Sequence, residues 1–241
     1  MKLLVTTRAD DSIDSMSEKT HPIIKKYAEK CGADFSILEC KSECNVGYGK
    51  SHFRIMALKE LLDEYDRILC LDSDIVIRSE CPDLFGVVPY ESIGTIYEDK
   101  GTRQDDRHNR IKLAQEQFGN IGWKEGYINT GVFLVSKPHK DIFNKINGEF
   151  YTGSGFDDVH LGYNINKNNH PVFELPFVYN HMTMFSEGWN DNADRFDSHI
   201  IHYAGEGIFD RSILTNKTEQ IISDMEVIEI FEKESQMESV E

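Results

Sequence analysis

Two aspartates separated by one residue, Asp72 and Asp74, are the strongest chemical signal in the sequence. They lie between two apolar runs, residues 67–71 and 75–77, which predict buried strands. In open α/β sheets, ligands bind beyond the carboxyl ends of the strands. Adjacent carboxylates repel each other unless a cation lies between them, and Mg²⁺ and Mn²⁺ prefer carboxylate and phosphate oxygens. The pair therefore predicts a divalent-metal site for a phosphorylated ligand, although an ordinary aspartate turn would have the same pattern.

Residues 65–76 resemble the metal-binding segment of glycosyltransferases with the GT-A fold. The resemblance is strongest to the retaining family that contains glycogenin and the bacterial lipopolysaccharide galactosyltransferases, glycosyltransferase family 8. Three further segments resemble motifs of that family in the same order along the chain: Asn129-Thr130-Gly131, Asp157-Asp158-Val159 and His202-Tyr203-Ala204-Gly205. Four matches in order are much more specific than one, and the resemblance extends to about residue 209.

The resemblance implies a role for each matched residue. His202 is expected to join Asp72 and Asp74 as a ligand of Mn²⁺ or Mg²⁺. Asp158, with Asp157 as the second candidate, is expected beside the anomeric carbon, where it stabilises positive charge or acts as a nucleophile. The candidate donor-binding residues are Thr6, Thr7, Arg8, Asp10, Lys50, Arg54, Ser73, Asn129, Gly131 and Gly205.

The implied activity is transfer of a hexosyl group from a nucleotide-sugar, expected to be a UDP-sugar. The acceptor would be a hydroxyl group of a glycan or glycoconjugate. Retention of the anomeric configuration follows from the family resemblance alone. The implied fold is the Rossmann-like GT-A fold of the α/β class, with a mixed, mainly parallel central sheet flanked by helices.

The sequence departs from the family pattern after the histidine motif. The family has Lys-Pro-Trp at the place of residues 208–210, which are Ile-Phe-Asp in this chain. A lysine that would contact the diphosphate is therefore missing there. Arg8, Lys50, Arg54 and Arg211 are alternative cations, and the sequence does not choose among them.

Two other functions fit parts of the same pattern. Asp72 and Asp74 also satisfy the nucleophile motif of haloacid-dehalogenase-type phosphatases. That motif usually ends the first strand of its core, and it leaves His202 without a role. A non-catalytic protein that binds nucleotide-sugars or glycans is the third interpretation, which the missing lysine keeps open. A P-loop at residues 44–51 is discounted because Cys44 replaces the required glycine.

Alternating strand and helix signals predict the elements that would position these residues. Apolar runs predict strands near 2–7, 35–40, 67–71, 75–77, 92–97, 127–135 and 199–203. Helices are expected near 20–31, 53–65, 106–118, 137–150 and 157–167, the first with Thr20 as N-cap and Pro22 in its first turn. This alternation predicts a mainly parallel sheet covered on both faces. We expect one domain over residues 1–214 and an acidic helix and tail over residues 215–241.

The composition limits the partners. The chain has 26 basic and 42 acidic residues and a net charge of -16, which opposes binding to nucleic acids and to anionic membranes. No apolar run is long enough to span a membrane, and no signal peptide is recognised. The five cysteines are scattered, as is typical of reduced thiols, so a cytoplasmic location is expected.

Overall fold

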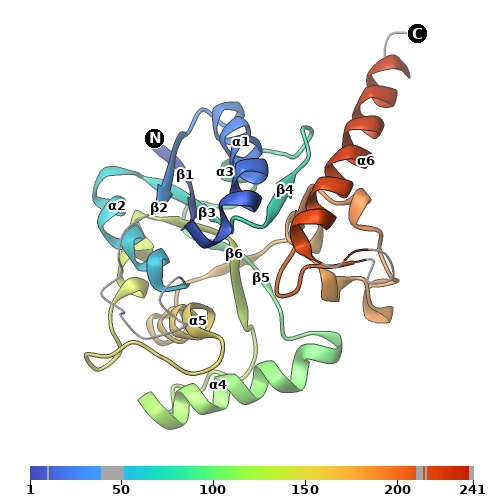
Figure 1. Cartoon of the computed structure of the whole chain (residues 1–241). Helices are drawn as coiled ribbons and strands as arrows, with labels where there is room; N and C mark the ends of the chain where they lie inside the picture. The colour runs from blue at the N-terminus through green and yellow to red at the C-terminus, as the bar shows by residue number, and fades with distance from the viewer. Residues whose placement is uncertain (10, 39–51, 210–213, 215, 239–241) are drawn as a thin grey trace.

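The strands assemble into two sheets (Figure 1). The structure, a computed structural model, describes residues 1–9, 11–38, 52–209, 214 and 216–238. Its strands are β1 (Leu3–Arg8), β2 (Asp34–Leu38), β3 (Arg67–Leu71), β4 (Ile75–Ile77), β5 (Ile93–Tyr97), β6 (Ile128–Ser136), β7 (Val172–Glu174), β8 (His181–Met182) and β9 (Ile200–His202). The large sheet has the order β2-β1-β3-β6-β5-β7, and the small sheet has the order β4-β9-β8.

The large sheet is mixed, with most strands parallel. β1 is parallel to both β2 and β3, and β5 is parallel to β7, whereas β6 runs antiparallel to its neighbours β3 and β5. Thr7 of β1 is opposite Leu71 of β3, so the residues that follow these two strands emerge at the same edge of the sheet. This edge is where Arg8 and Asp72 meet.

Helices cover both faces of the large sheet, as the alternation predicts. They are α1 (Asp14–Lys30), α2 (Leu58–Glu64), α3 (Leu84–Val87), α4 (Gln104–Phe118), α5 (Phe156–Asn168) and α6 (Lys217–Glu238). Leu69 and Leu71 of β3 pack with α1 and α3, whereas Ile68 and Cys70 pack with α2 and α5, because successive side chains of a strand point to opposite faces. α4 packs against α5 on the side away from the sheet (Figure 1).

Short 3-10 helices connect many of these elements. Four of them follow one another between β7 and β9, where regular structure is otherwise limited to β8. The 3-10 helices are η1 (Asp11–Ile13), η3 (His52–Ala57), η4 (Gly101–Arg103), η5 (Lys137–Phe143), η6 (Phe177–Tyr179), η7 (Thr183–Phe185), η8 (Gly188–Asn190) and η9 (Arg195–Asp197).

The start of the first helix differs from the prediction. α1 begins at Asp14, so Thr20 is not its N-cap and Pro22 lies inside the helix. The hydroxyl of Thr20 donates instead to the backbone oxygen of Ser73 at 2.6 Å. The apolar side chain of Met16 is buried against the small sheet and α6, which favours the additional helical turns before Thr20.

The predicted helix over residues 137–150 is wrong in its second half. Only Lys137–Phe143 is helical, as a 3-10 helix, and Asn144 is extended with ψ 151°. The backbone oxygen of Asn144 accepts hydrogen bonds from His160 Nε2 at 2.9 Å and from Asn164 Nδ2 at 2.8 Å. Side chains of α5 therefore satisfy the carbonyl that a continued helix would have used.

α6 packs against the body of the protein at its N-terminal end. Ile221 and Ile228 are buried against Val76 of β4 and Ile201 of β9. Its C-terminal end extends away from the sheets (Figure 1). Among the described residues, no helix combines the length and the apolar character needed to cross a membrane. The expected domain boundary at residue 214 stays a prediction.

Candidate active site

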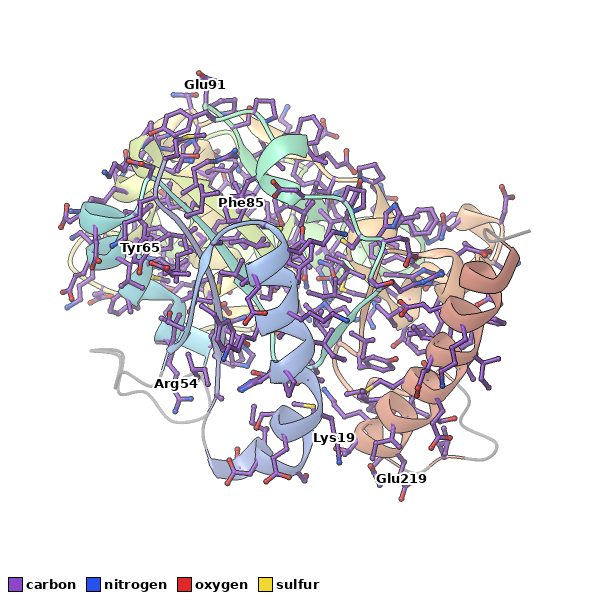
Figure 2. The ribbon with its side chains drawn as sticks, turned by 90° about the horizontal axis from the view of Figure 1, so that it is seen from above. Lys19, Arg54, Tyr65, Phe85, Glu91 and Glu219 are labelled. Carbon is purple, nitrogen blue, oxygen red and sulfur yellow. The ribbon has the colours of Figure 1, made fainter. Side chains whose placement is uncertain are left out.

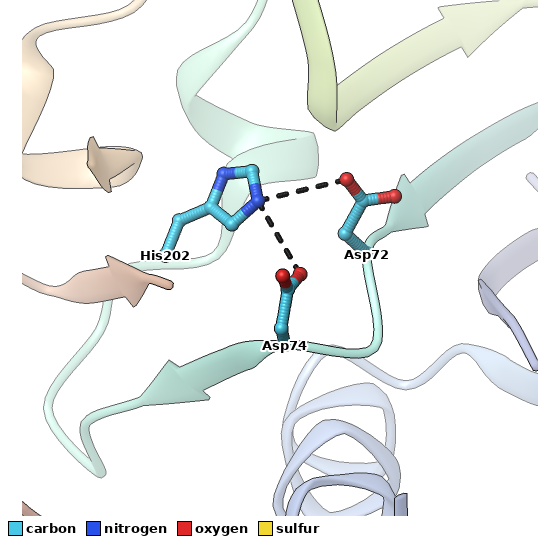
Figure 3. A group of neighbouring side chains, drawn as sticks. All are labelled: Asp72, Asp74 and His202. Atoms are coloured by element: carbon cyan, nitrogen blue, oxygen red, sulfur yellow. Dashed lines mark ion pairs between the residues drawn. The ribbon is translucent and has the colours of Figure 1, made fainter. Parts of the chain in front are cut away.

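Asp72, Asp74 and His202 form a cluster just beyond the carboxyl end of β3 (Figure 3). One ligand atom from each side chain lies within 4.8 Å of the other two. His202 Nε2 is 3.4 Å from Asp74 Oδ1 and 3.6 Å from Asp72 Oδ2. Two carboxylates and an imidazole nitrogen that converge on one point are a suitable donor set for a divalent ion such as Mn²⁺.

Backbone pairing brings His202 to the aspartates from far along the chain. His202 of β9 is opposite Ile75 of β4, the residue that follows Asp74. The backbone N–H of Tyr203 donates to the backbone oxygen of Asp74 at 2.9 Å. The backbone N–H of Asp72 donates to β6 at 2.9 Å, so the first aspartate is tied to the large sheet. The cluster therefore joins the two sheets.

A line of hydrogen-bonded side chains orients the imidazole ring of His202. Asn129 Nδ2 donates to Glu98 Oε2, and Asn180 Nδ2 donates to Asn129 Oδ1, both at 3.1 Å. The Asn180 side-chain oxygen lies 2.8 Å from His202 Nδ1 and accepts a hydrogen bond from it. This hydrogen bond orients the ring so that Nε2 faces the two carboxylates. A Cβ atom on Gly131 would lie 2.2 Å from His202 Cε1, so only glycine leaves room for this ring.

Opposite charges stabilise the cluster. Burial opposes the charge on His202, but Asp74 and Asp72 outweigh it and raise its pKa. Burial opposes the charge on Asp74 as well, yet His202 and Lys217 hold the pKa of that carboxyl below its usual range. A metal ion would compete with these positive charges for Asp74, and its coordination would require the neutral form of the His202 imidazole.

Arg8, which is buried at the end of β1, links the metal cluster to α5. Its Nε donates to Asp72 Oδ1 at 3.1 Å, and its Nη1 donates to Asp157 Oδ2 at 2.6 Å. Nη1 also donates to the backbone oxygen of His52 at 2.8 Å. Burial disfavours the charged guanidinium, but Asp72 and Asp157 outweigh this effect and raise the pKa of Arg8. Arg8 is thus a buried cation shared by two carboxylates.

A strained turn begins α5 and places Asp157 and Asp158. Gly155 has φ 94° and Phe156 has φ 35°, a region of backbone space that a bulky L-residue rarely adopts. Both carboxylates then reach Thr130 of β6. Asp157 Oδ2 accepts from the Thr130 hydroxyl at 2.8 Å, and Asp158 Oδ1 accepts from the Thr130 backbone N–H at 2.9 Å.

These adjacent carboxylates have opposite electrostatic environments. Burial raises the pKa of Asp157, but Arg8 and His52 outweigh it, so the net pKa is lowered. For Asp158, burial and the negative charges of Asp157 and Glu98 act in the same direction and raise the pKa to about 8. Divergent pKa values of paired acidic groups are typical of acid–base and charge-stabilising sites.

Asp158 borders a cavity of about 580 Å³, whereas Asp157 does not. The candidate donor residues Asn129 and Gly205 also border it. Thr183 borders the cavity as well, and its buried hydroxyl has no hydrogen-bond partner among the residues that the structure describes. The charged residues in the cavity wall are Glu98, Arg103, Arg107, Asp158, Glu187 and Glu206.

The other candidate donor residues lie around the strand ends. The hydroxyls of Thr7 and Ser73 are 3.0 Å apart. Thr6 is buried and donates to the backbone oxygen of Ser36 at 3.0 Å, which directs it toward β2. Arg54 donates to the backbone oxygen of Ala9. Two of the candidate donor residues, together with one of the alternative cations, lie outside the described residues: Asp10, Lys50 and Arg211.

Several residues of the site have no counterpart in the sequence prediction. Glu98 and Asn180 belong to the line that orients His202, and Lys217 Nζ donates to Asp74 Oδ2 at 2.7 Å. Asn180 follows a 3-10 helix and Lys217 begins a helix expected as a tail, so neither lies in a motif. Glu98 follows β5 directly, and the strand-end rule that identified Asp72 would have identified it too.

Solved structures with a similar fold are glycosyltransferases. One glycosyltransferase, involved in the glycosylation of the major capsid of PBCV-1, has 14% identity, a TM-score of 0.59, and coverage of 92% of this chain and 99% of that chain. The galactosyltransferase LgtC in complex with donor and acceptor sugar analogues has 15% identity, a TM-score of 0.58 and coverage of 92% and 94%. GlyE of Streptococcus pneumoniae TIGR4, in its apo form, has 15% identity, a TM-score of 0.54 and coverage of 97% and 64%. At these identities the likeness shows the fold alone.

The sequence itself also has a family match. No curated protein matches the chain. Residues 3–141 match the model of glycosyl transferase family 8. This segment covers more than half of the 241 residues and includes Asp72 and Asp74. The family match does not favour the alternative interpretation as a haloacid-dehalogenase-type phosphatase. The chain therefore belongs to glycosyl transferase family 8 and is a glycosyltransferase with the GT-A fold.

Proposed function

We propose that this glycosyltransferase moves a hexosyl group from a UDP-sugar to a hydroxyl of a glycan or glycoconjugate, with retention of configuration and with Mn²⁺ or Mg²⁺. The convergence of Asp72, Asp74 and His202 within 4.8 Å supports metal dependence most directly. Family membership supports retention and the nucleotide-sugar donor. The scattered cysteines, of which Cys31, Cys70 and Cys81 are free thiols, support a cytoplasmic location.

Metal binding would be the task of the two aspartates and His202. A divalent ion supplies Lewis-acid stabilisation of a leaving diphosphate. Asn180 keeps the imidazole in the tautomer that presents Nε2, and Arg8 keeps Asp72 in place while neutralising part of its charge. These residues prepare the site before the donor arrives.

Asp158 is the better candidate for contact with the sugar. It borders the cavity, whereas Asp157 is buried and bound to Arg8. We propose that Asp157 positions the turn. Asp158, whose pKa lies near 8, would hydrogen-bond the sugar when protonated and stabilise developing positive charge when ionised.

The acceptor would occupy the same cavity from the side of Glu187 and Glu206. Carboxylates bind sugar hydroxyls well, because each oxygen accepts hydrogen bonds from neutral donors. These two carboxylates in the cavity wall therefore support a hydroxyl-rich acceptor such as a glycan.

Calorimetric titration of the protein with nucleotide-sugars, with and without Mn²⁺, tests this function. We expect one nucleotide-sugar to bind only with metal present. We expect Asp74→Ala to weaken this binding by about 100-fold or more, because it removes a ligand and leaves His202 and Lys217 without their carboxylate. Asp63→Ala, on the exposed end of α2, is the matched control. Undiminished affinity in Asp74→Ala would remove the basis of the proposal.

A further inference from the structure

The first turn of α6 reaches into the metal cluster. Lys217 Nζ donates to Asp74 Oδ2 at 2.7 Å, on the carboxylate whose other oxygen faces His202. The side chain of Lys217 is 28% exposed, so it borders solvent on one side. Figure 2 shows this end of α6 near Glu219, next to the start of α1 near Lys19. A helix expected as a tail thus contributes a cation to the site.

A buried carboxylate fixes α6 in this position. Asp224 is 1% exposed and accepts hydrogen bonds from Arg195 Nε at 2.7 Å, Arg195 Nη2 at 2.9 Å, the Tyr203 hydroxyl at 2.8 Å and Gln220 Nε2 at 2.7 Å. Tyr203 is the residue next to His202. The same strand end therefore carries a candidate metal ligand and the anchor for α6, which ties the position of Lys217 to that of His202.

Binding of a divalent ion would change the charge balance around Lys217. The ion would take over Asp72 and Asp74, and a lysine ammonium held 2.7 Å from Asp74 would then face a second cation at close range. Arg8 keeps a carboxylate in that case, because it is also paired with Asp157. Lys217 has no second carboxylate partner among the described residues. Metal binding would therefore weaken the pairing of Lys217 with Asp74 and leave its ammonium group available to another anion.

We propose that Lys217 is a donor-site residue with two partners: Asp74 in the metal-free protein, and the diphosphate of the donor when metal and donor are bound. This inference rests on the proposed function and names a further residue of the same site. A diphosphate that shares the metal would lie within reach of the long, flexible lysine side chain. Arg54, the other described basic candidate, already donates to the backbone oxygen of Ala9. Of the cations among the described candidates, Lys217 is thus the one that becomes available when the metal binds.

The substitution Lys217→Met tests the proposal, because methionine preserves much of the side-chain length and removes the charge. Calorimetry would measure the affinity for Mn²⁺ alone and the affinity for UDP at saturating Mn²⁺. We expect affinity for Mn²⁺ alone to rise about threefold or more, since a competing cation is gone. We expect affinity for UDP to fall about tenfold, since a charge-assisted hydrogen bond is lost.

Opposite signs in the two titrations distinguish this role from a structural one. Lys233→Met, on the exposed side of the same helix, is the control and should change neither affinity. A loss of both affinities in Lys217→Met would show that the lysine only supports the fold of the site, and would overturn the proposal. Unchanged UDP affinity would overturn it as well while leaving the proposed function intact. Absence of UDP binding by the wild-type protein would instead refute the proposed function, and this inference with it.

Asp224 is a positioning residue for Lys217, and a double-mutant cycle tests it. Asp224→Asn weakens the anchor of α6, and its folding is checked by thermal unfolding. We expect Asp224→Asn to lower UDP affinity in the wild-type background by about threefold or more, and to have no further effect in Lys217→Met. Equal losses in both backgrounds would show that Asp224 does not act through Lys217.

Discussion

The site is built from two regions that differ in how they place their side chains. From β1 to β6, strands of the large sheet carry Arg8 and Thr130, and Asp72 directly follows β3. Backbone pairing brings all three to one edge. From β7 to α6, short 3-10 helices and the small sheet carry Asn180 and His202. Pairing of β9 with β4 brings His202 to the site, and side-chain hydrogen bonds orient its ring. The site residues of the first region thus lie in or directly after strands of the large sheet, whereas those of the second region pack against this sheet from outside it.

This difference predicts different consequences for substitutions. A charged group buried among the strands stabilises the fold and the site together, so its loss should affect both. A polar group in the second region orients a ligand and contributes little apolar burial, so its loss should affect the site more than the fold. Substitutions in each region test this contrast, from the largest expected effect to the smallest.

Arg8→Met should be the most destabilising of these changes. It leaves Asp72 and Asp157 without their shared buried cation, and removing one partner of a buried ion pair costs about 3–5 kcal/mol. Urea unfolding measures the loss. Lys2→Met removes a cation near the start of the same strand, but its pair with Glu64 is exposed, so a much smaller loss of stability is expected. Equal effects of the two substitutions would contradict a core role for Arg8.

His202→Ala should abolish most metal binding and leave the fold largely intact. It removes one of three ligands, and we expect Mn²⁺ affinity to fall about 100-fold or more, equivalent to about 2.7 kcal/mol. Calorimetry with Mn²⁺ measures this. His199→Ala changes a histidine just before β9 that packs on Tyr179, outside the cluster, and serves as the control. If His202→Ala lost more folding stability than Arg8→Met, the proposed contrast between the two regions would be wrong.

Asn180→Ala should have a smaller effect on the same measurement. The His202 ring loses the acceptor that fixes its tautomer, and loss of such an outer hydrogen bond lowers metal affinity about 10- to 100-fold. Asn168→Ala, an exposed asparagine that donates to Asp141, is the matched control. Unaltered Mn²⁺ affinity in Asn180→Ala would show that backbone pairing alone orients His202, as it orients the residues of the first region.

The same contrast explains how much of the molecule can be predicted from the sequence. Strands and their ends have a local pattern, so the apolar run before Asp72 predicts a strand that ends there, as β3 does. A mixed sheet with helices on both faces is expected from the sequence and is confirmed. The assignment of individual site residues by motif stays a prediction. Glu98 is missed although it follows β5 directly, because a lone glutamate at a strand end has no motif around it.

The second region has no comparable pattern. Asn180 follows η6, a turn too short for any periodicity. Lys217 reaches Asp74 from α6, a helix whose buried Asp224 accepts hydrogen bonds from Arg195. The error at residues 144–150 has the same cause, since the Asn144 carbonyl is satisfied by α5 side chains. Long-range side-chain hydrogen bonds determine these segments, and a single sequence does not show them.

Asp158→Asn should give the smallest of these effects, and it depends on pH. The pKa of Asp158 is raised to about 8 by burial and by Asp157 and Glu98, whereas an aspartate in an unfolded chain titrates near ~4. Between these values the folded protein binds more protons than the unfolded chain, so the contribution of Asp158 to stability is present at low pH and is lost as pH rises.

Asparagine does not ionise, so the variant should lose less stability than the wild type between about pH 5 and about pH 8.5. We expect a difference of about 1–2 kcal/mol, because solvent in the cavity screens part of the charge. Urea unfolding at the two pH values measures it, with the exposed Asp63→Asn as control. Asp158 lies on α5, the helix that contacts the first region through Thr130 and, by way of Asp157, through Arg8. A pH dependence unchanged by the substitution would show that its carboxyl is as well compensated as that of Asp157, and the division of roles between the two aspartates would then have no electrostatic basis.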